Sequence, residues 1–157
     1  MTLYARVAVT LLTAGLAMAS ASYAQQKKIK REELPAAVEK TVVEQSKGAT
    51  VKEFSKEIEK GKTYFEAELV VNGHGKDILM DENGKVVEVE EEVALDSLPA
   101  AVKEGLERAA GSAKISKVES LTKGGKLVAY EAVVKTAGKR SEIQVGPEGQ
   151  KLDHHQE

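Results

Sequence analysis

Apolar residues recur with helical spacing in two segments of the chain, and each segment precedes a stretch in which apolar and polar residues alternate. The first apolar stripe runs from Leu34 to Val42, and the second runs from Leu98 to Leu106. Steps of three and four residues place these side chains on one face of a helix, with charged residues on the other. Each segment therefore predicts one amphipathic helix.

The alternating stretches predict antiparallel strands with one buried and one solvated face. Phe65 and Tyr130 stand at the centre of two such stretches, and glycine-containing turns such as Asn72-Gly73 separate the strands. Val51 and Phe54 have opposite parity, so a β-bulge is predicted near residues 52–53. The predicted strands cover 49–59, 62–71, 75–81 and 85–93, and then 113–122, 126–136, 139–145 and 150–154.

The two helix-and-strand segments are copies of one another. The sequence Leu-Pro-Ala-Ala-Val at 34–38 returns at 98–102, 64 positions later, and Phe65-Glu66-Ala67 returns as residues 130–132. A repeat of this length is a supersecondary unit. We therefore predict an α+β protein of two tandem repeats, each with one helix packed on a four-stranded antiparallel sheet. The first repeat spans 25–95 and the second spans 96–157, and the pattern leaves open whether the two sheets join.

Residues 1–24 have the pattern of a signal peptide. Arg6 is the only charge before an apolar run that ends at Met18, and small residues lead to Ser22-Tyr23-Ala24. We expect cleavage after Ala24, with Ala19 and Ala21 as alternative sites. The apolar run is shorter than a membrane-spanning helix requires. The mature protein is therefore expected to be periplasmic or secreted, with no stable membrane anchor.

Composition narrows the functional classes further. The chain has no cysteine, which excludes disulfides and thiol catalysis, and its net charge is −2 with 23 basic and 25 acidic side chains. The charges are interspersed without a basic stripe, so no nucleic-acid partner is expected. The densest charge run lies within residues 88–92 and contains four glutamates. It indicates a solvated strand or, less commonly, a site for a cation or a basic partner.

The Leu-Pro-Ala-Ala-Val motif, followed by hairpins that end in Asp-Glu-Asn-Gly-Lys-Val at 81–86, resembles PepSY-like domains. These are exported bacterial modules with a β-lactamase-inhibitor-protein-like fold, and the resemblance covers nearly all of the mature chain as two copies. It implies a protein that restrains peptidases or binds other proteins through a sheet face. The family pattern contains no catalytic residues. The second copy departs from the pattern at its last turn, which reads Gly-Pro-Glu-Gly at 146–149.

The side chains with chemical potential do not form a recognisable catalytic or metal-binding pattern. His74 lies in a glycine-rich turn without a partner nearby in sequence, and His154 and His155 point to opposite faces if they lie on a strand. No nucleophile elbow or phosphate-binding loop is present. We therefore expect no enzyme activity, no catalytic residue, no metal and no cofactor.

The leading hypothesis is a non-enzymatic protein-binding module whose partner is an envelope protein, such as a peptidase. Its predicted binding surface is the solvated face of the sheet, where Tyr64 is the only aromatic residue assigned by parity. The alternatives are a small-ligand or cation sensor that uses Glu88–Glu92, and a purely structural repeat protein. The residues predicted to bind the partner are Tyr64, Glu66, Glu68 and Glu131.

Overall fold

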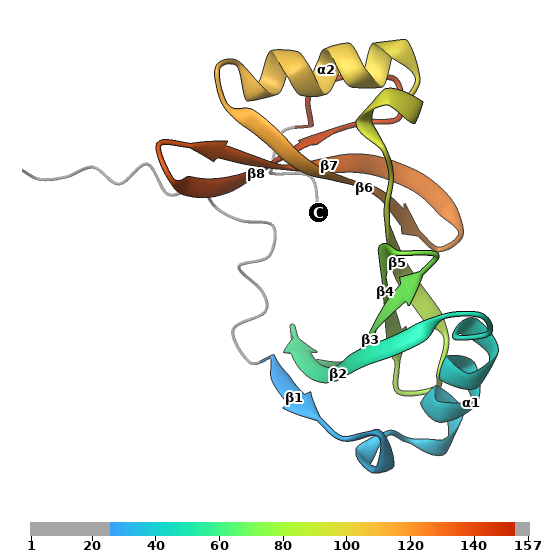
Figure 1. Ribbon diagram of the computed structural model, residues 1–157. Helices are drawn as coiled ribbons and strands as arrows, with labels where there is room; N and C mark the ends of the chain where they lie inside the picture. The colour runs from blue at the N-terminus through green and yellow to red at the C-terminus, as the bar shows by residue number, and fades with distance from the viewer. Residues whose placement is uncertain (1–25, 153–157) are drawn as a thin grey trace, which may run out of the picture.

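A computed structural model describes residues 26–152 and contains one continuous sheet of eight antiparallel strands. Strand order in the sheet follows the sequence, so every strand pairs with its neighbours along the chain. Figure 1 shows that the sheet is strongly curved and that both helices lie on its outer side. The opposite face of the sheet therefore lines the inside of the curve.

The strands have seven to eleven residues, except at the first edge of the sheet, where β1 has three. Two single-turn 3-10 helices, η2 (Arg31–Glu33) and η3 (Leu95–Ser97), precede the α-helices α1 (Ala36–Gln45) and α2 (Ala100–Ala110). The strands are β1 (Lys27–Ile29), β2 (Thr50–Glu59), β3 (Lys62–Val71), β4 (His74–Asp81), β5 (Val86–Glu92), β6 (Lys114–Lys123), β7 (Lys126–Thr136) and β8 (Lys139–Val145).

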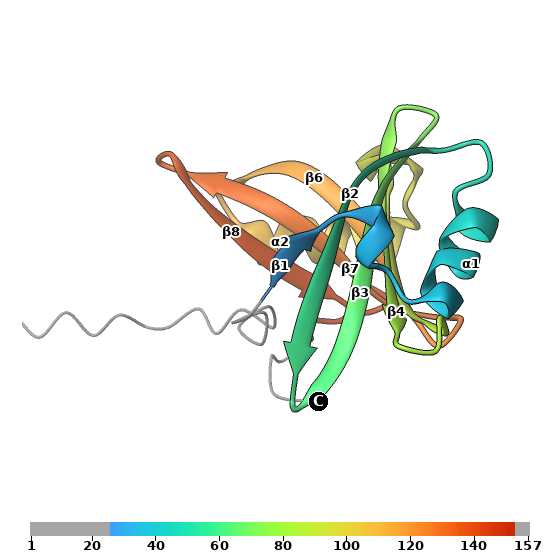
Figure 2. The same cartoon turned by 90° about the horizontal axis from the view of Figure 1, so that it is seen from below.

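Each helix buries its apolar stripe against the sheet. In the first repeat, Val38 and Val42 on α1 pack with Phe65 on β3 and Ile78 on β4. Figure 2 shows α1 alongside the strands of the first repeat. In the second repeat Val102 and Leu106 are fully buried in an equivalent cluster. The helices are short, so burial of this stripe rather than intrinsic propensity stabilises them. The two clusters form separate hydrophobic cores under one sheet.

Glycines in the last turn of each repeat allow the turn to lie directly against the helix. Gly84 has φ +75°, and its carbonyl oxygen accepts a 2.7 Å hydrogen bond from the Thr41 hydroxyl on α1. Gly149 has φ +77° and lies against the carbonyl of Ala101 on α2. A Cβ at either glycine would overlap with the helix backbone. These glycines are therefore required both by the positive φ and by the close approach.

The prediction of two units that each have their own four-stranded sheet is wrong, because the structure has one sheet of eight strands, and this also decides the question left open by the sequence of whether the two sheets join. β5 pairs with β6, from Glu88 opposite Lys123 to Glu92 opposite Glu119, and this pairing joins the two repeats into one sheet. Hydrophobic alternation along each strand indicates which face is buried, but it does not specify which strands meet edge to edge. The predicted signal peptide lies outside the described residues.

Two strand predictions at the ends of the sheet are also corrected. β1 was not predicted, because three residues are too few for an alternation pattern to be visible. The strand predicted over 150–154 is reduced to an isolated bridge between Val145 and Lys151, and residues 153–157 lie outside the described part of the chain. The bulge predicted near residues 52–53 is confirmed by a register shift between Val51 and Glu53.

Candidate binding face of the sheet

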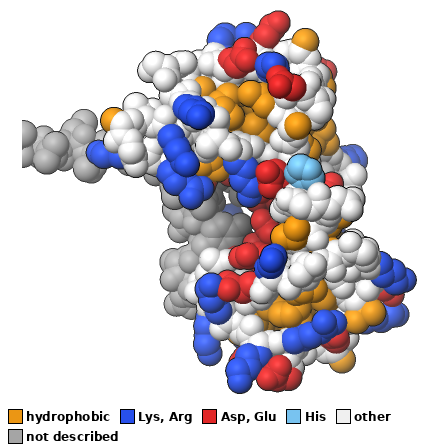
Figure 3. Space-filling model, viewed as in Figure 1, with side chains coloured by type: hydrophobic (Ala, Val, Ile, Leu, Met, Phe, Trp, Pro, Cys, Tyr) orange, Lys and Arg blue, Asp and Glu red, His pale blue; other side chains and the backbone are white. Residues whose placement is uncertain are grey.

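The face of the sheet that points away from the helices, here called the open face, is acidic across its central strands. Side chains that alternate with the buried core residues point to this face, and the strand register places them side by side. Figure 3 shows acidic side chains gathered in the hollow between the two halves of the molecule. The open face carries Glu53, Ser55 and Glu57 from β2, Tyr64, Glu66 and Glu68 from β3, Asp77 and Leu79 from β4, Glu88, Glu90 and Glu92 from β5, Lys117, Glu119 and Leu121 from β6, and Glu131 from β7.

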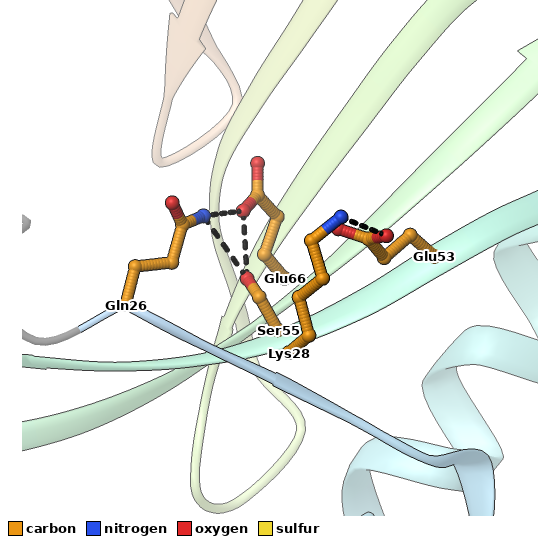
Figure 4. Close-up of polar contacts among 5 residues, drawn as sticks. All are labelled: Gln26, Lys28, Glu53, Ser55 and Glu66. Carbon is orange, nitrogen blue, oxygen red and sulfur yellow. Dashed lines mark hydrogen bonds and ion pairs between the residues drawn. The ribbon is translucent and has the colours of Figure 1, made fainter.

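One carboxylate cluster lies on β2 and β3, beside Gln26, which is the first residue that the structure describes. Ser55 and Glu66 are cross-strand partners, and the Ser55 hydroxyl donates a 2.9 Å hydrogen bond to Glu66. The amide of Gln26 donates to Ser55 and, at 2.8 Å, to Glu66 (Figure 4). The same amide also donates to Glu57 at 3.1 Å. On the same strand, Glu53 forms an ion pair with Lys28. Within residues 26–152, Glu57 and Glu66 have no ion-pair partner, and their hydrogen bonds come from the uncharged side chains of Gln26 and Ser55.

Burial and mutual repulsion raise the pKa values in this cluster. Glu57 is only 2% exposed, and its burial together with the nearby charge of Glu66 raises its pKa to about 8. Burial also raises the pKa of Glu66, and the hydrogen bond from Ser55 opposes part of this rise. At neutral pH the folded protein therefore holds a proton on Glu57, and ionising this group inside the fold costs free energy.

A second cluster joins both repeats at the centre of the sheet. Carboxylate oxygens of Asp77, Glu90 and Glu119, from β4, β5 and β6, lie within 4.8 Å of one another. Burial and then the charge of Glu66 raise the pKa of Asp77 to about 6. Burial and then the charge of Glu131 raise the pKa of Glu90 to about 8. These are the groups that the pairing of β5 with β6 brings together.

Lys117 supplies the cation beside this second cluster. Its ammonium lies 2.5 Å from a carboxylate oxygen of Glu119, whose side chain is 8% exposed. Burial lowers the pKa of Lys117, but the hydrogen bond and charge of Glu119 outweigh this effect and raise the pKa overall. Asp77 and Glu92 add smaller attractions to the same ammonium. The cluster thus has one cation of its own for several carboxylates.

The structure places all four predicted binding residues on the open face. Tyr64 is half-buried near the β2–β3 hairpin, opposite Glu57 on the neighbouring strand. Glu66 belongs to the first cluster, and Glu68 is the cross-strand partner of Asp77. Glu131 lies opposite Glu119, and it accepts a 2.6 Å hydrogen bond from Gln144. Burial raises the pKa of Glu131, and this hydrogen bond opposes part of the rise. These residues form one face rather than the faces of two separate sheets.

The acidic run on β5 is divided between the two faces. Glu88, Glu90 and Glu92 point to the open face, whereas Glu91 lies on the helix side and pairs with Lys76 at 2.6 Å. Sequence reasoning missed several members of the open face, because isolated acidic residues on different strands give no local pattern. Their shared parity with the recognised glutamates is the one signal that could have found them. The missed acidic residues include Glu57, Asp77 and Glu119.

Solved structures with the same fold have low sequence identity to this chain. A DUF2874 family protein from Bacteroides ovatus is 18% identical with a TM-score of 0.61, and the match covers 76% of this chain and 85% of that chain. A BLIP-like protein from Bacteroides fragilis is 21% identical with a TM-score of 0.57, and the match covers 76% and 84%. A candidate periplasmic protein from Bacteroides eggerthii is 18% identical with a TM-score of 0.63, and the match covers 76% and 86%.

These matches show a shared BLIP-like fold, which agrees with the fold implied by the resemblance, while the PepSY-like assignment itself stays a prediction. No protein-family model matches the sequence, and no curated protein matches it. Within residues 26–152, no helix is both long enough and apolar enough to cross a membrane.

Proposed function

We propose that this protein is a non-enzymatic, exported binding module that recognises a basic surface of another envelope protein through the open face of its sheet. The observation that carries this proposal is the surplus of half-buried carboxylates on the inside of the curved sheet. Like charges placed side by side reduce stability, so a face that keeps them is poorly explained by folding alone. A partner that brings lysine or arginine side chains would remove this repulsion.

The location is supported by two independent observations. The first is the signal-peptide pattern of residues 1–24. The second is the fold shared with a Bacteroides eggerthii protein described as a candidate periplasmic protein. Restraint of a peptidase is the more specific form of the proposal, and it rests on the PepSY-like resemblance.

The shape and composition of the open face fit a protein partner better than a small substrate. The face extends over the six strands from β2 to β7, and Tyr64, its one aromatic residue among residues 26–152, lies at the edge of the first carboxylate cluster. Tyrosine is enriched among residues that dominate binding energy, because it combines large contact area with a hydroxyl group. Charged groups around it provide orientation and speed the encounter.

The proposal is tested by capture of proteins from a cell-envelope extract on immobilised protein. We expect a partner that binds the wild-type protein and is lost from the double variant Tyr64→Ala/Glu66→Lys. Glu44→Lys is the matched control, because Glu44 is exposed on α1, on the other side of the sheet. Binding should weaken as salt rises above about 0.1 M, where the Debye length is about 10 Å. Equal capture by the wild-type protein and the double variant would show that the open face is not the binding surface.

The alternative function is cation sensing by Glu88–Glu92, and a calcium titration followed by the melting temperature tests it. Asp77, Glu90 and Glu119 offer oxygen ligands, but the ammonium of Lys117 already lies against Glu119. A ligand bound only by the folded state raises the melting temperature. A calcium titration that leaves the melting temperature unchanged would contradict sensing of that cation, whereas a saturable rise would contradict the preference for a basic partner at this cluster.

A further inference from the structure

A second surface feature lies on the helix side of the sheet, away from the open face. It is a cavity of about 540 Å³ between η2 and the start of the sheet, here called the η2 groove. Its floor is apolar and is formed by Ile29, Ile58 and Phe65. Ile58 is 42% exposed although it is a large aliphatic residue. The groove therefore offers an apolar surface that the chain leaves in contact with solvent.

Two lysines border this apolar floor. Lys27 on β1 and Lys56 on β2 are direct cross-strand partners, and both line the groove. Among residues 26–152, neither ammonium has an ion-pair partner. Like charges directly opposite each other on a sheet are destabilising. The pair therefore favours an anion that bridges the two ammonium groups.

The second repeat has the same backbone arrangement without these side chains. The strand pair that corresponds to Lys27 and Lys56 is Glu91 opposite Ser120, and Glu91 is already paired with Lys76. The shift of 64 positions that aligns Leu34 with Leu98 also places Thr122 at the position of Ile58. An apolar floor with a paired cationic rim is thus a property of the first repeat, and the fold does not require it.

We propose that the η2 groove binds an amphipathic anion with a single alkyl chain, such as a fatty acid. The carboxylate of the ligand lies between Lys27 and Lys56, and its alkyl chain covers Ile58 and the buried ring of Phe65. The cavity volume falls within the range of roughly 300–1,000 Å³ that is usual for small-molecule sites. Glu33 is the one acidic residue of the lining, and its carboxylate is held by the backbone N–H of Lys30 at 2.7 Å.

Calorimetric titration with decanoate and octanoate, below their micelle concentrations, tests this proposal directly. We expect one saturable site, with decanoate bound about tenfold more tightly than octanoate, because each buried methylene contributes about 0.8 kcal/mol. Decyltrimethylammonium has the same tail and the opposite charge, and it should not bind. Failure of decanoate to bind, or equal binding of the cationic analogue, would overturn the proposal.

Two variants separate the head-group contact from the tail contact. Lys27→Gln/Lys56→Gln should weaken decanoate binding at least tenfold, whereas Lys40→Gln/Lys47→Gln changes the same charge on the exposed surface near α1 and should leave it unchanged. Ile58→Ser should weaken binding and reduce the difference between the two chain lengths. Leu127→Ser is its control, because Leu127 is 40% exposed and lies outside the groove. Unchanged affinity in both groove variants would assign any binding to another surface.

Discussion

The substitution Glu57→Gln measures how much free energy of unfolding the protein loses by having an ionisable group at this buried position of the open face. Glu57 is nearly fully buried, and burial and the charge of Glu66 raise its pKa from 4.5 to about 8. Glutamine has almost the same shape and keeps a carbonyl oxygen that accepts the hydrogen bond from the Gln26 amide. The substitution therefore removes the titratable group and leaves the packing nearly unchanged.

The sign of the effect follows from proton linkage. Between pH 4.5 and pH 8 the folded protein holds a proton on Glu57 that the unfolded chain releases, so the folded state loses stability as pH rises through this window. A pKa difference of this size corresponds to an upper limit of roughly 4 kcal/mol at pH 8. Because water and side-chain rearrangement screen part of the cost, we expect Glu57→Gln to stabilise the protein by about 1–2 kcal/mol at pH 8.

Urea denaturation at half-unit steps from pH 5 to pH 8 measures this difference. The stabilisation of Glu57→Gln relative to the wild-type protein should grow with pH and be small at pH 5. Glu44→Gln, on the exposed surface of α1, is the matched control and should change stability by less than about 0.5 kcal/mol at every pH. A destabilised Glu57→Gln, or a difference that does not depend on pH, would refute the reasoning.

Three further predictions concern the scaffold and the second cluster. Gly149→Ala should lower the free energy of unfolding by about 2–4 kcal/mol in urea denaturation, because it adds a Cβ at φ +77° against the Ala101 carbonyl. Val102→Ala should cost about 2–4 kcal/mol in the same assay, because Val102 is fully buried under α2, whereas Val43→Ala, at a site 49% exposed, should cost less than about 0.5 kcal/mol. Lys117→Met should destabilise the protein by about 1–3 kcal/mol in the same assay at neutral pH, because it removes the ammonium that lies against the buried carboxylate of Glu119; an unchanged free energy of unfolding would contradict this account.

The predicted stabilisation of Glu57→Gln also bears on the proposed function. A variant that is more stable and binds its partner less well would show that the carboxylate is kept for recognition at a cost to folding. The same variant with full binding would limit the recognition surface to the more exposed glutamates. The two measurements on one protein therefore separate the contribution of Glu57 to stability from its contribution to binding.

Local physical chemistry made much of the fold readable from the sequence. Helical spacing from Leu34 to Val42, alternation around Phe65 and the bulge near residue 52 all involve residues a few positions apart, and the structure agrees with each. The placement of Glu66 and Glu131 on the solvated side was also predictable, because side chains alternate strictly along a strand. The very short β1 and the truncated last strand gave no pattern long enough to detect.

The sequence by itself determined the repeat, the two helices, the buried stripe of each strand and the side of the strand on which the glutamates lie, because each depends on neighbours within one turn or one hairpin. Only the tertiary structure decided that β5 pairs with β6, since the edge that a strand presents to a distant strand has no local signature. That pairing gathers Asp77, Glu90 and Glu119 into one cluster and makes the open face continuous across both repeats. The candidate binding surface therefore arises from an edge-to-edge contact between two copies of the same unit.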